Sequence, residues 1–308
     1  MASKLLLYEG KDLRTINLQG HLRGLAWDLQ DRFPIIVGKG GRVLKIQGDG
    51  PITLDSGARH NLRAVSVNPS DGTALIVGNA GTVLLLDGER FTKITVPTFE
   101  NLRAAAWNHD GSVALLAGNN GTLLKFSRGQ VVMVDAGRAN LRDISWYPKS
   151  GSALISSNCF AEEFIPSPNL FGYEDDAGTV RPLNEGRLDL IGVDWERTGE
   201  SALVVGYDVV WHTGFIGEFD GTTLTPIPFE NKHVYPVAVS CKPTADVAAI
   251  VTATAQVGTA KGTLFLWNGK SLEVIFSAPE FFFSDIAWAW KSGSLAAIAS
   301  TETRTFNA

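Results

Sequence analysis

Four arginines recur in one local context and supply the clearest chemistry in the chain. Each follows a leucine at the start of a short apolar stretch, and they are Arg23, Arg63, Arg103 and Arg142. A guanidinium binds carboxylates and phosphates through paired hydrogen bonds, so several on one surface would attract an acidic loop, a terminal carboxylate or a phosphate. The alternative is that each arginine packs its stem on a neighbouring repeat and pairs with a carboxylate or carbonyl inside the protein.

Three aspartates in corresponding stretches suggest a second chemistry. Asp143, Asp194 and Asp285 could place carboxylates near a common channel, where two of them would serve as acid, base or nucleophile on a glycosidic bond. The structural interpretation is that they cap turns or pair with arginines of adjacent repeats. We favour the structural interpretation, because a fold does not by itself determine a function.

Other catalytic and metal-binding patterns are missing from the sequence. The five histidines are scattered, the two cysteines (Cys159 and Cys241) lie far apart, and neither a Cys-x-x-Cys nor a Gly-x-Ser-x-Gly motif occurs. We therefore expect no metal, no cofactor and no enzymatic activity.

Composition narrows the setting and the partners. The net charge of -5 over 308 residues gives no basic excess for a nucleic-acid partner. Two cysteines do not form a disulfide framework, and the opening "MASKLLLYEG" has too short an apolar run for a signal peptide. No uncharged apolar stretch of about 18 residues predicts membrane insertion. The sequence predicts a soluble, cytoplasmic monomer.

The arginines and aspartates belong to a repeat that occurs seven times. Its anchor is a short strand that usually ends in tryptophan, and the seven strands end at Trp27, Val67, Trp107, Trp146, Trp195, Cys241 and Trp288. The spacing is close to the roughly 40 to 45 residues of a propeller blade. Each repeat contains short apolar stretches separated by turn residues, with no helical periodicity. In the third repeat we expect strands at 102–107, 113–117, 122–126 and 131–134.

These features predict an all-β fold, a single seven-bladed β-propeller domain over residues 1–308. Each blade would be a four-stranded antiparallel sheet. The opening "LLLYEGKDLRTI" matches "LFLWNGKSLEVI" of the sixth repeat. We therefore expect strands within 4–18 to complete the last blade, which 283–300 begins, and to close the ring. The tail "TETRTFNA" is left over, either competing for the third strand position or staying outside the sheet.

Loop lengths break the sevenfold symmetry on the face that carries the arginines. The connections between second and third strands are short in the first three repeats and long in the next three. The long loops contain the candidate binding residues Phe160, Phe164, Trp211 and His212, since aromatic side chains dominate interface hot spots. The alternative is that these rings bury each other, and that Glu162 and Glu163 neutralise the arginines as an internal lock.

The rhythm W-N-P-D-G followed by A-L-x-V-G-N-x-G-T-V-L resembles the repeats of WD-repeat-like propellers, and especially of photosystem II assembly factor-like proteins. Here the tryptophan ends the first strand of a repeat rather than the third. The resemblance implies binding and assembly work. We therefore expect a non-enzymatic protein-binding scaffold whose partner carries an acidic segment. The alternatives are an enzyme acting on a carbohydrate or other small substrate at the channel, and a structural protein that contacts a copy of itself.

Overall fold

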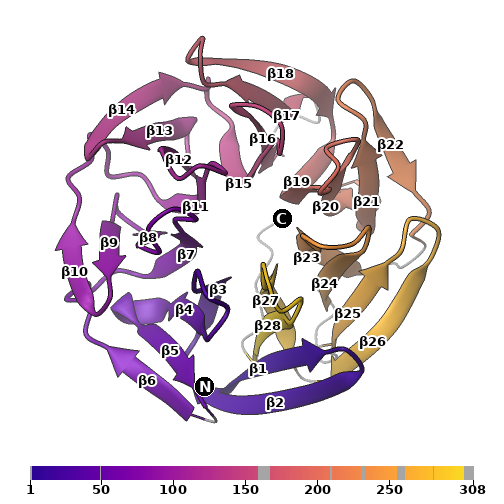
Figure 1. Cartoon of the computed structure of the whole chain (residues 1–308). Helices are drawn as coiled ribbons and strands as arrows, with labels where there is room; N and C mark the ends of the chain where they lie inside the picture. The colour runs from indigo at the N-terminus through magenta and orange to yellow at the C-terminus, as the bar shows by residue number, and fades with distance from the viewer. Residues whose placement is uncertain are drawn as a thin grey trace.

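Each repeat folds into four strands because its apolar stretches are short and are separated by glycine-containing turns. The result is a closed ring of seven four-stranded antiparallel sheets, which Figure 1 shows along its central channel. The computed structural model describes residues 2–48, 50–158, 167–208, 210–229, 233–254, 261–279 and 281–301. The predicted all-β, seven-bladed propeller is confirmed.

The strands of each blade are ordered outward from the channel. The innermost strands are β3 (Leu22–Trp27), β7 (Leu62–Val67), β11 (Leu102–Trp107), β15 (Asn140–Trp146), β19 (Leu188–Trp195), β23 (Val234–Cys241) and β27 (Phe282–Trp288). The second strands are β4 (Pro34–Gly38), β8 (Ala74–Gly78), β12 (Val113–Gly118), β16 (Ser152–Asn158), β20 (Ala202–Asp208), β24 (Ala248–Thr254) and β28 (Leu295–Ser300).

The outer half of each blade is built in the same way. The third strands are β5 (Val43–Gln47), β9 (Val83–Asp87), β13 (Thr122–Ser127), β17 (Ser167–Glu174), β21 (Thr213–Phe219), β25 (Lys261–Trp267) and β1 (Ala2–Glu9). The outermost strands are β6 (Gly50–Leu54), β10 (Arg90–Lys93), β14 (Gln130–Asp135), β18 (Thr179–Gly186), β22 (Leu224–Ile227), β26 (Leu272–Pro279) and β2 (Asp12–Gln19).

Helical structure is nearly absent from the described residues. The described residues contain one short 3-10 turn, η1 (Lys39–Gly41), between β4 and β5. Across the same residues, no helix has the length and apolar character needed to cross a membrane.

The hydrophobic core lies between neighbouring blades rather than inside any one of them. Second strands are buried on both sides, as in β4 and β8, and their side chains pack on the blades before and after. One such layer joins Leu5 and Ile298 of the last blade to Leu22 and Ile36 of the first. Burial of these aliphatic side chains is the main stabilising contribution to the ring.

The N-terminal strands close the ring as predicted. The last blade has the strand order β2-β1-β28-β27, with Leu5 of β1 opposite Ile298 of β28 and Ile16 of β2. Leu5 is fully buried, so the first residues of the chain are part of the core. The third strand position of this blade is occupied by β1, and the tail from residue 302 lies outside the described residues.

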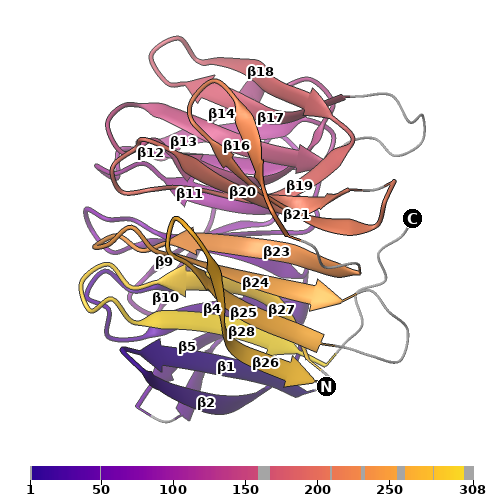
Figure 2. The same cartoon turned by 90° about the vertical axis from the view of Figure 1, so that its right-hand side faces the viewer.

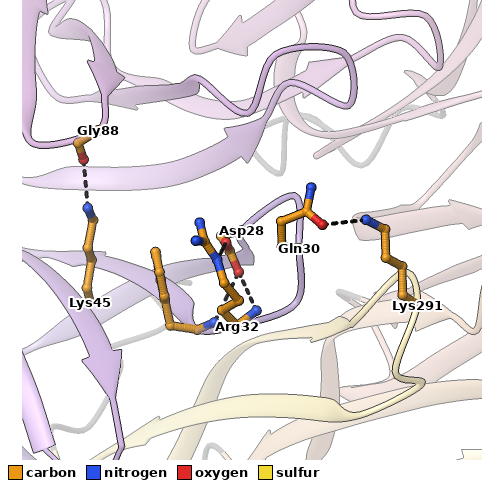
Figure 3. A network of polar contacts seen from close by, with 7 residues as sticks. Asp28, Gln30, Arg32, Lys45, Gly88 and Lys291 are labelled. Carbon is orange, nitrogen blue, oxygen red and sulfur yellow. Dashed lines mark hydrogen bonds and ion pairs between the residues drawn. The ribbon is translucent and has the colours of Figure 1, made fainter.

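A second set of contacts closes the same seam on one face of the ring. The strands run between two loop-bearing faces, as Figure 2 shows from the side. On the face where first and second strands connect, Asp31 accepts backbone N–H bonds from Trp290 and Ser292 at 3.1 and 2.8 Å. Lys291 donates to Gln30 across the seam at 2.9 Å, beside the Asp28–Arg32 pair (Figure 3). First and last blades are thus joined by sheet, core and loop contacts.

Candidate functional site

The candidate site begins with the repeated triplet Asn-Leu-Arg at the start of an innermost strand. The leucines Leu62, Leu102 and Leu141 are fully buried. The preceding asparagine side chain accepts a backbone N–H from the turn of the previous blade, as between Asn61 and Gly40 at 3.0 Å and between Asn101 and Ala80 at 3.1 Å. The triplet therefore fixes each strand start against the blade before it.

Every innermost strand then contains a β-bulge at the same position. The strand register shifts around one residue in all seven blades, and that residue is Arg23, Arg63, Arg103, Arg142, Ile191, Val237 or Ser284. A bulge leaves one residue unpaired and redirects its side chain. The four predicted arginines therefore occupy equivalent positions in four consecutive blades. We call them the arginine rim, and they lie at the end of the channel where the innermost strands begin.

Three of the four guanidinium groups donate to side-chain carbonyl oxygens of asparagines, which agrees with the intramolecular pairing considered from the sequence. Arg63 donates from Nε to Asn79 Oδ1 at 2.5 Å, and Arg103 donates to Asn119 at 2.7 Å. Arg142 donates in the same way to Asn158. Asn79 and Asn119 directly follow the second strand of their blades, where the Gly-Asn turn motif was the available sequence signal, whereas Asn158 is the last residue of β16 and follows a serine.

Electrostatic repulsion shows that the arginines converge. The pKa of Arg63 is lowered to about 10, mainly by burial and additionally by the charges of Arg23 and Arg142. Burial also lowers the pKa of Arg142, while the nearby Asp189 carboxylate raises it. Asp189 is itself buried and accepts hydrogen bonds from Asn158 at 3.0 Å and Tyr207 at 2.6 Å. Positive charge is therefore compensated at the Arg142 end of the rim and concentrated around Arg63.

The predicted loop aromatics fall into two groups. Phe160 and Phe164 lie outside the described residues, together with Glu162 and Glu163 of the suggested internal lock. Trp211 and His212 lie between β20 and β21, where Asp208 Oδ1 accepts the Trp211 backbone N–H at 2.9 Å. Trp211 is 74% exposed, so it is not buried against another loop.

One exposed aromatic on this face is absent from the sequence-based prediction. Phe99 lies on the connection from β10 to β11 and is 92% exposed. Connections from outermost to innermost strands lie on the arginine face, as do those from second to third strands. The sequence signal was an isolated phenylalanine in the otherwise polar loop "VPTFEN".

The three channel aspartates connect blades to one another. Asp143 accepts the Val193 N–H of the next blade at 3.0 Å, and Asp285 accepts the Leu25 N–H of the first blade at 2.8 Å. Asp194 accepts the Cys241 N–H at 2.8 Å. An innermost strand has an unpaired edge towards the channel, and these carboxylates satisfy its N–H groups. For Asp143 and Asp194 this replaces the pairing with arginines that the structural interpretation proposed.

Burial also changes the acidity of these groups. It raises the pKa of Asp143 to about 7, with smaller contributions from the charges of Asp285 and Asp194, and raises the pKa of Asp194 to about 6. Cys241 is a free, buried thiol whose pKa is raised by burial. Across the described ranges, no group of three histidine, cysteine, aspartate or glutamate side chains could hold a metal ion.

Comparison with known proteins supports the fold alone. No protein-family model matches the chain, and no curated protein sequence is similar to it. Among solved structures, a chain of hydrazine synthase from Kuenenia stuttgartiensis is similar over 90% of this chain and 92% of its own length, with 12% identity and a TM-score of 0.70. A putative TolB from Agrobacterium tumefaciens is similar over 97% and 98%, with 11% identity and a TM-score of 0.59.

Proposed function

We propose that this protein is a non-enzymatic binding or assembly scaffold whose arginine rim receives an acidic segment of a protein partner. The observation that carries the proposal is the convergence of like charges. Arg63 lies near enough to Arg23 and Arg142 for their charges to lower its pKa. A folded protein gains nothing from such repulsion by itself, whereas an anionic partner would relieve it.

The guanidinium geometry supports a carboxylate-bearing partner. A guanidinium has five N–H donors, and the bond from Arg63 Nε to Asn79 engages one of them. Within the described residues this is the only side-chain hydrogen bond of Arg63. The Nε contact orients the group, and its remaining donors suit the paired oxygens of a carboxylate.

Exposed aromatics supply apolar anchors on the same face. Phe99 and Trp211 are 92% and 74% exposed, which is unusual for side chains of this size. Aromatic residues ringed by polar groups are the side chains that contribute most to protein interfaces. A partner with aspartate or glutamate beside an apolar residue would engage both.

The proposal extends to the kind of propeller, its location in the cell and its oligomeric state. The similarity of the repeats to WD-repeat-like and photosystem II assembly factor-like propellers supports interaction rather than catalysis. The proposed location is the cytoplasm, where the free thiol of Cys241 would stay reduced. The proposed solution state is a monomer.

The test compares a variant that lacks three arginines of the rim with a variant that lacks three arginines elsewhere on the surface. One variant carries Arg63→Ala, Arg103→Ala and Arg142→Ala. The matched control removes three exposed arginines away from the rim, with Arg90→Ala, Arg128→Ala and Arg181→Ala. Binding of a fluorescent oligoglutamate peptide is measured by anisotropy at low and moderate salt, and partners from a lysate are identified by mass spectrometry.

We expect the rim variant to lose at least tenfold in peptide affinity and to lose its specific partners. The control should change affinity by less than about threefold, because distant exposed charges are screened at moderate salt. Equal losses in the two variants, or an unchanged partner set for the rim variant, would refute the rim as the binding surface.

The second proposal is an enzyme that uses the channel carboxylates on a carbohydrate or another small polar substrate. The raised pKa of Asp143, about 7, favours it, because a general acid must be protonated near neutral pH. It ranks second because Asp143 already accepts the backbone N–H groups of Val193 and Ile144. A glycan hydrolysis screen with Asp143→Asn as the matched variant tests it, and turnover abolished by that change would support it.

A further inference from the structure

A cavity of about 370 Å³ opens at the end of the channel opposite the arginine rim. We call this end the tryptophan mouth, because the innermost strands finish there at Trp27, Trp107, Trp146, Trp195 and Trp288. The space exists because the residue before each strand end is small in six blades. These residues are Ala26, Ser66, Ala106, Ser145, Ser240 and Ala287.

The fifth blade breaks this pattern with an acid. Asp194 occupies the equivalent position and is the one ionisable side chain in that layer of the cavity wall. Its carboxylate is oriented by Ser145 Oγ at 2.7 Å and by the Cys241 N–H at 2.8 Å. No cationic side chain among the described residues forms an ion pair with it. A buried carboxylate without a counterion is costly, so the wall has one position where a positive charge would be stabilised.

The neighbourhood of the fifth blade is acidic as well. Burial raises the pKa of Glu196 at the cavity edge, and the charges of Glu218, Asp246 and Glu200 raise it further. Arg197 also lines the cavity, and its guanidinium lies 3.9 Å from the Asp246 carboxylate. The carboxylates of Asp194 and Glu196 therefore favour a cation on this side of the cavity, where the charge of Arg197 is compensated by Asp246.

Aromatic rings surround the opening. Trp107 and Trp195 are partly exposed at the cavity, and Trp290 is 56% exposed. The Lys242 ammonium already lies 4.8 Å from the centre of the Trp288 ring, so one ring of this wall holds a cation. Cations are attracted to the faces of tryptophan rings at such distances.

The opening is spanned by residues from blades on opposite sides of the ring. His109 of the third blade and Trp290 of the seventh contact edge to face, with ring centres 6.5 Å apart. His109 also lies 3.3 Å from the Trp146 carbonyl oxygen. The loop of Trp290 is fixed by Asp31 and by the bond from Lys291 to Gln30 that Figure 3 shows. The contact between these two rings therefore crosses part of the cavity opening.

We propose that this cavity binds a small organic ammonium ion, paired with the Asp194 carboxylate and enclosed by the tryptophan rings of the mouth. A cavity of this size suits a ligand of small-molecule dimensions. The site is independent of the arginine rim, which lies at the other end of the channel and attracts the opposite charge.

The test compares a charged probe with an uncharged one of the same shape. The probes are choline and its neutral analogue, in which carbon replaces the ammonium nitrogen. Binding to the full-length protein is measured by calorimetry and by the fluorescence of the mouth tryptophans. We expect choline to bind at least tenfold more tightly. Equal affinities, or no binding of choline, would overturn the proposal without any variant.

A pair of matched variants then locates the charge. Asp194→Asn removes the carboxylate of the cavity wall, and Asp143→Asn makes the same change at a channel aspartate that does not line the cavity. We expect Asp194→Asn to lose at least tenfold in choline affinity and Asp143→Asn to stay within about twofold. Similar losses in both would overturn the assignment. The triple rim variant should bind choline like the wild type, which separates this proposal from the proposed function.

Discussion

Replacing Arg63 by methionine distinguishes a binding residue from an internal structural contact. The change removes the charge and the Nε bond to Asn79 but keeps an apolar stem of similar length. If the arginine is mainly structural, its loss destabilises the protein. If it is held for a partner against repulsion from Arg23 and Arg142, its loss relieves strain in the free protein.

The structure sets the magnitude of both effects. A pKa lowered to about 10 from the ordinary arginine value corresponds to about 3 kcal/mol of cost to the charged form, with burial as the largest cause, since one pKa unit is about 1.4 kcal/mol. Arg63 is partly exposed, so solvent screening reduces this to about 1 to 2 kcal/mol. The lost hydrogen bond costs about 1 kcal/mol. At low ionic strength the free energy of unfolding should therefore stay constant or rise by about 1 kcal/mol.

Urea denaturation at low and high sodium chloride measures the difference. Salt screens the repulsion from Arg23 and Arg142 but neither the cost of burial, which is the larger cause of the pKa shift, nor the hydrogen bond. Arg63→Met should therefore lose stability relative to the wild type as salt is raised, by less than about 1 kcal/mol. Arg63→Lys, which keeps the charge, is the control and should show no such salt-dependent gain. A loss of 2 kcal/mol or more for Arg63→Met at both salt concentrations would refute the reasoning and make the rim a structural feature.

Three further predictions concern the ring itself. Leu5→Ala should lower the free energy of unfolding by about 3 kcal/mol, because the Leu5 side chain is fully buried in the closing strand. Leu13→Ala is the control and should cost under about 1 kcal/mol, because Leu13 is 36% exposed. Equal effects of the two variants in urea denaturation would contradict closure by β1. The pKa of Asp143 is about 7 when folded and about 4 when unfolded, so its contribution to stability is complete below pH 4 and is lost as the pH rises through 7. In the Asp143→Asn variant, the free energy of unfolding measured between pH 4 and 8 should no longer show this loss of stability. A pH dependence parallel to that of the wild type would contradict the raised pKa of Asp143. Gly24→Ala should lower the free energy of unfolding by about 1 to 3 kcal/mol, because the new Cβ would lie 2.6 Å from a carbonyl oxygen of the second blade. Gly50 has open space around it, so Gly50→Ala should leave the melting temperature within about a degree of the wild type.

The fold could be predicted from the sequence because each repeat carries its own strand and turn signals. The third blade shows this, since the predicted strand 102–107 is observed as β11 with the same bounds. Closure was also predictable, because the first residues repeat the pattern of β25 and β26. These inferences needed only local periodicity and internal similarity.

The site could be predicted only in part, because its geometry depends on contacts between distant residues. The arginines were visible as repeats, but the bulge that redirects them looks like an ordinary strand in the sequence. The partner asparagines lie 16 residues away from their arginines. The cavity at the other end was hidden for a similar reason, since alanine or serine before a tryptophan resembles normal strand alternation.

The residue before the end of each innermost strand also explains why the tryptophans of the mouth differ in their hydrogen bonds. Where the previous blade has alanine there, the indole N–H donates to its carbonyl, as from Trp27 to Ala287 at 3.1 Å and from Trp146 to Ala106 at 3.0 Å. Where it has serine, the hydroxyl instead accepts the tryptophan backbone N–H. The pairs are Ser66 with Trp107, Ser145 with Trp195 and Ser240 with Trp288.

Where the previous blade has serine, the indole N–H of Trp107, Trp195 or Trp288 has no hydrogen-bond partner within the described ranges. A small change from alanine to serine thus moves the anchor of a tryptophan from its ring to its backbone. In this group the rings of Trp107 and Trp195 are partly exposed at the cavity and Trp288 is buried under Lys242, whereas Trp27 and Trp146 of the alanine group are both buried. Asp194 continues the serine pattern with a charge, because it too accepts the next backbone N–H. One position of the repeat therefore determines how neighbouring blades are joined, and both partly exposed rings of the tryptophan mouth, Trp107 and Trp195, lie where that position is serine.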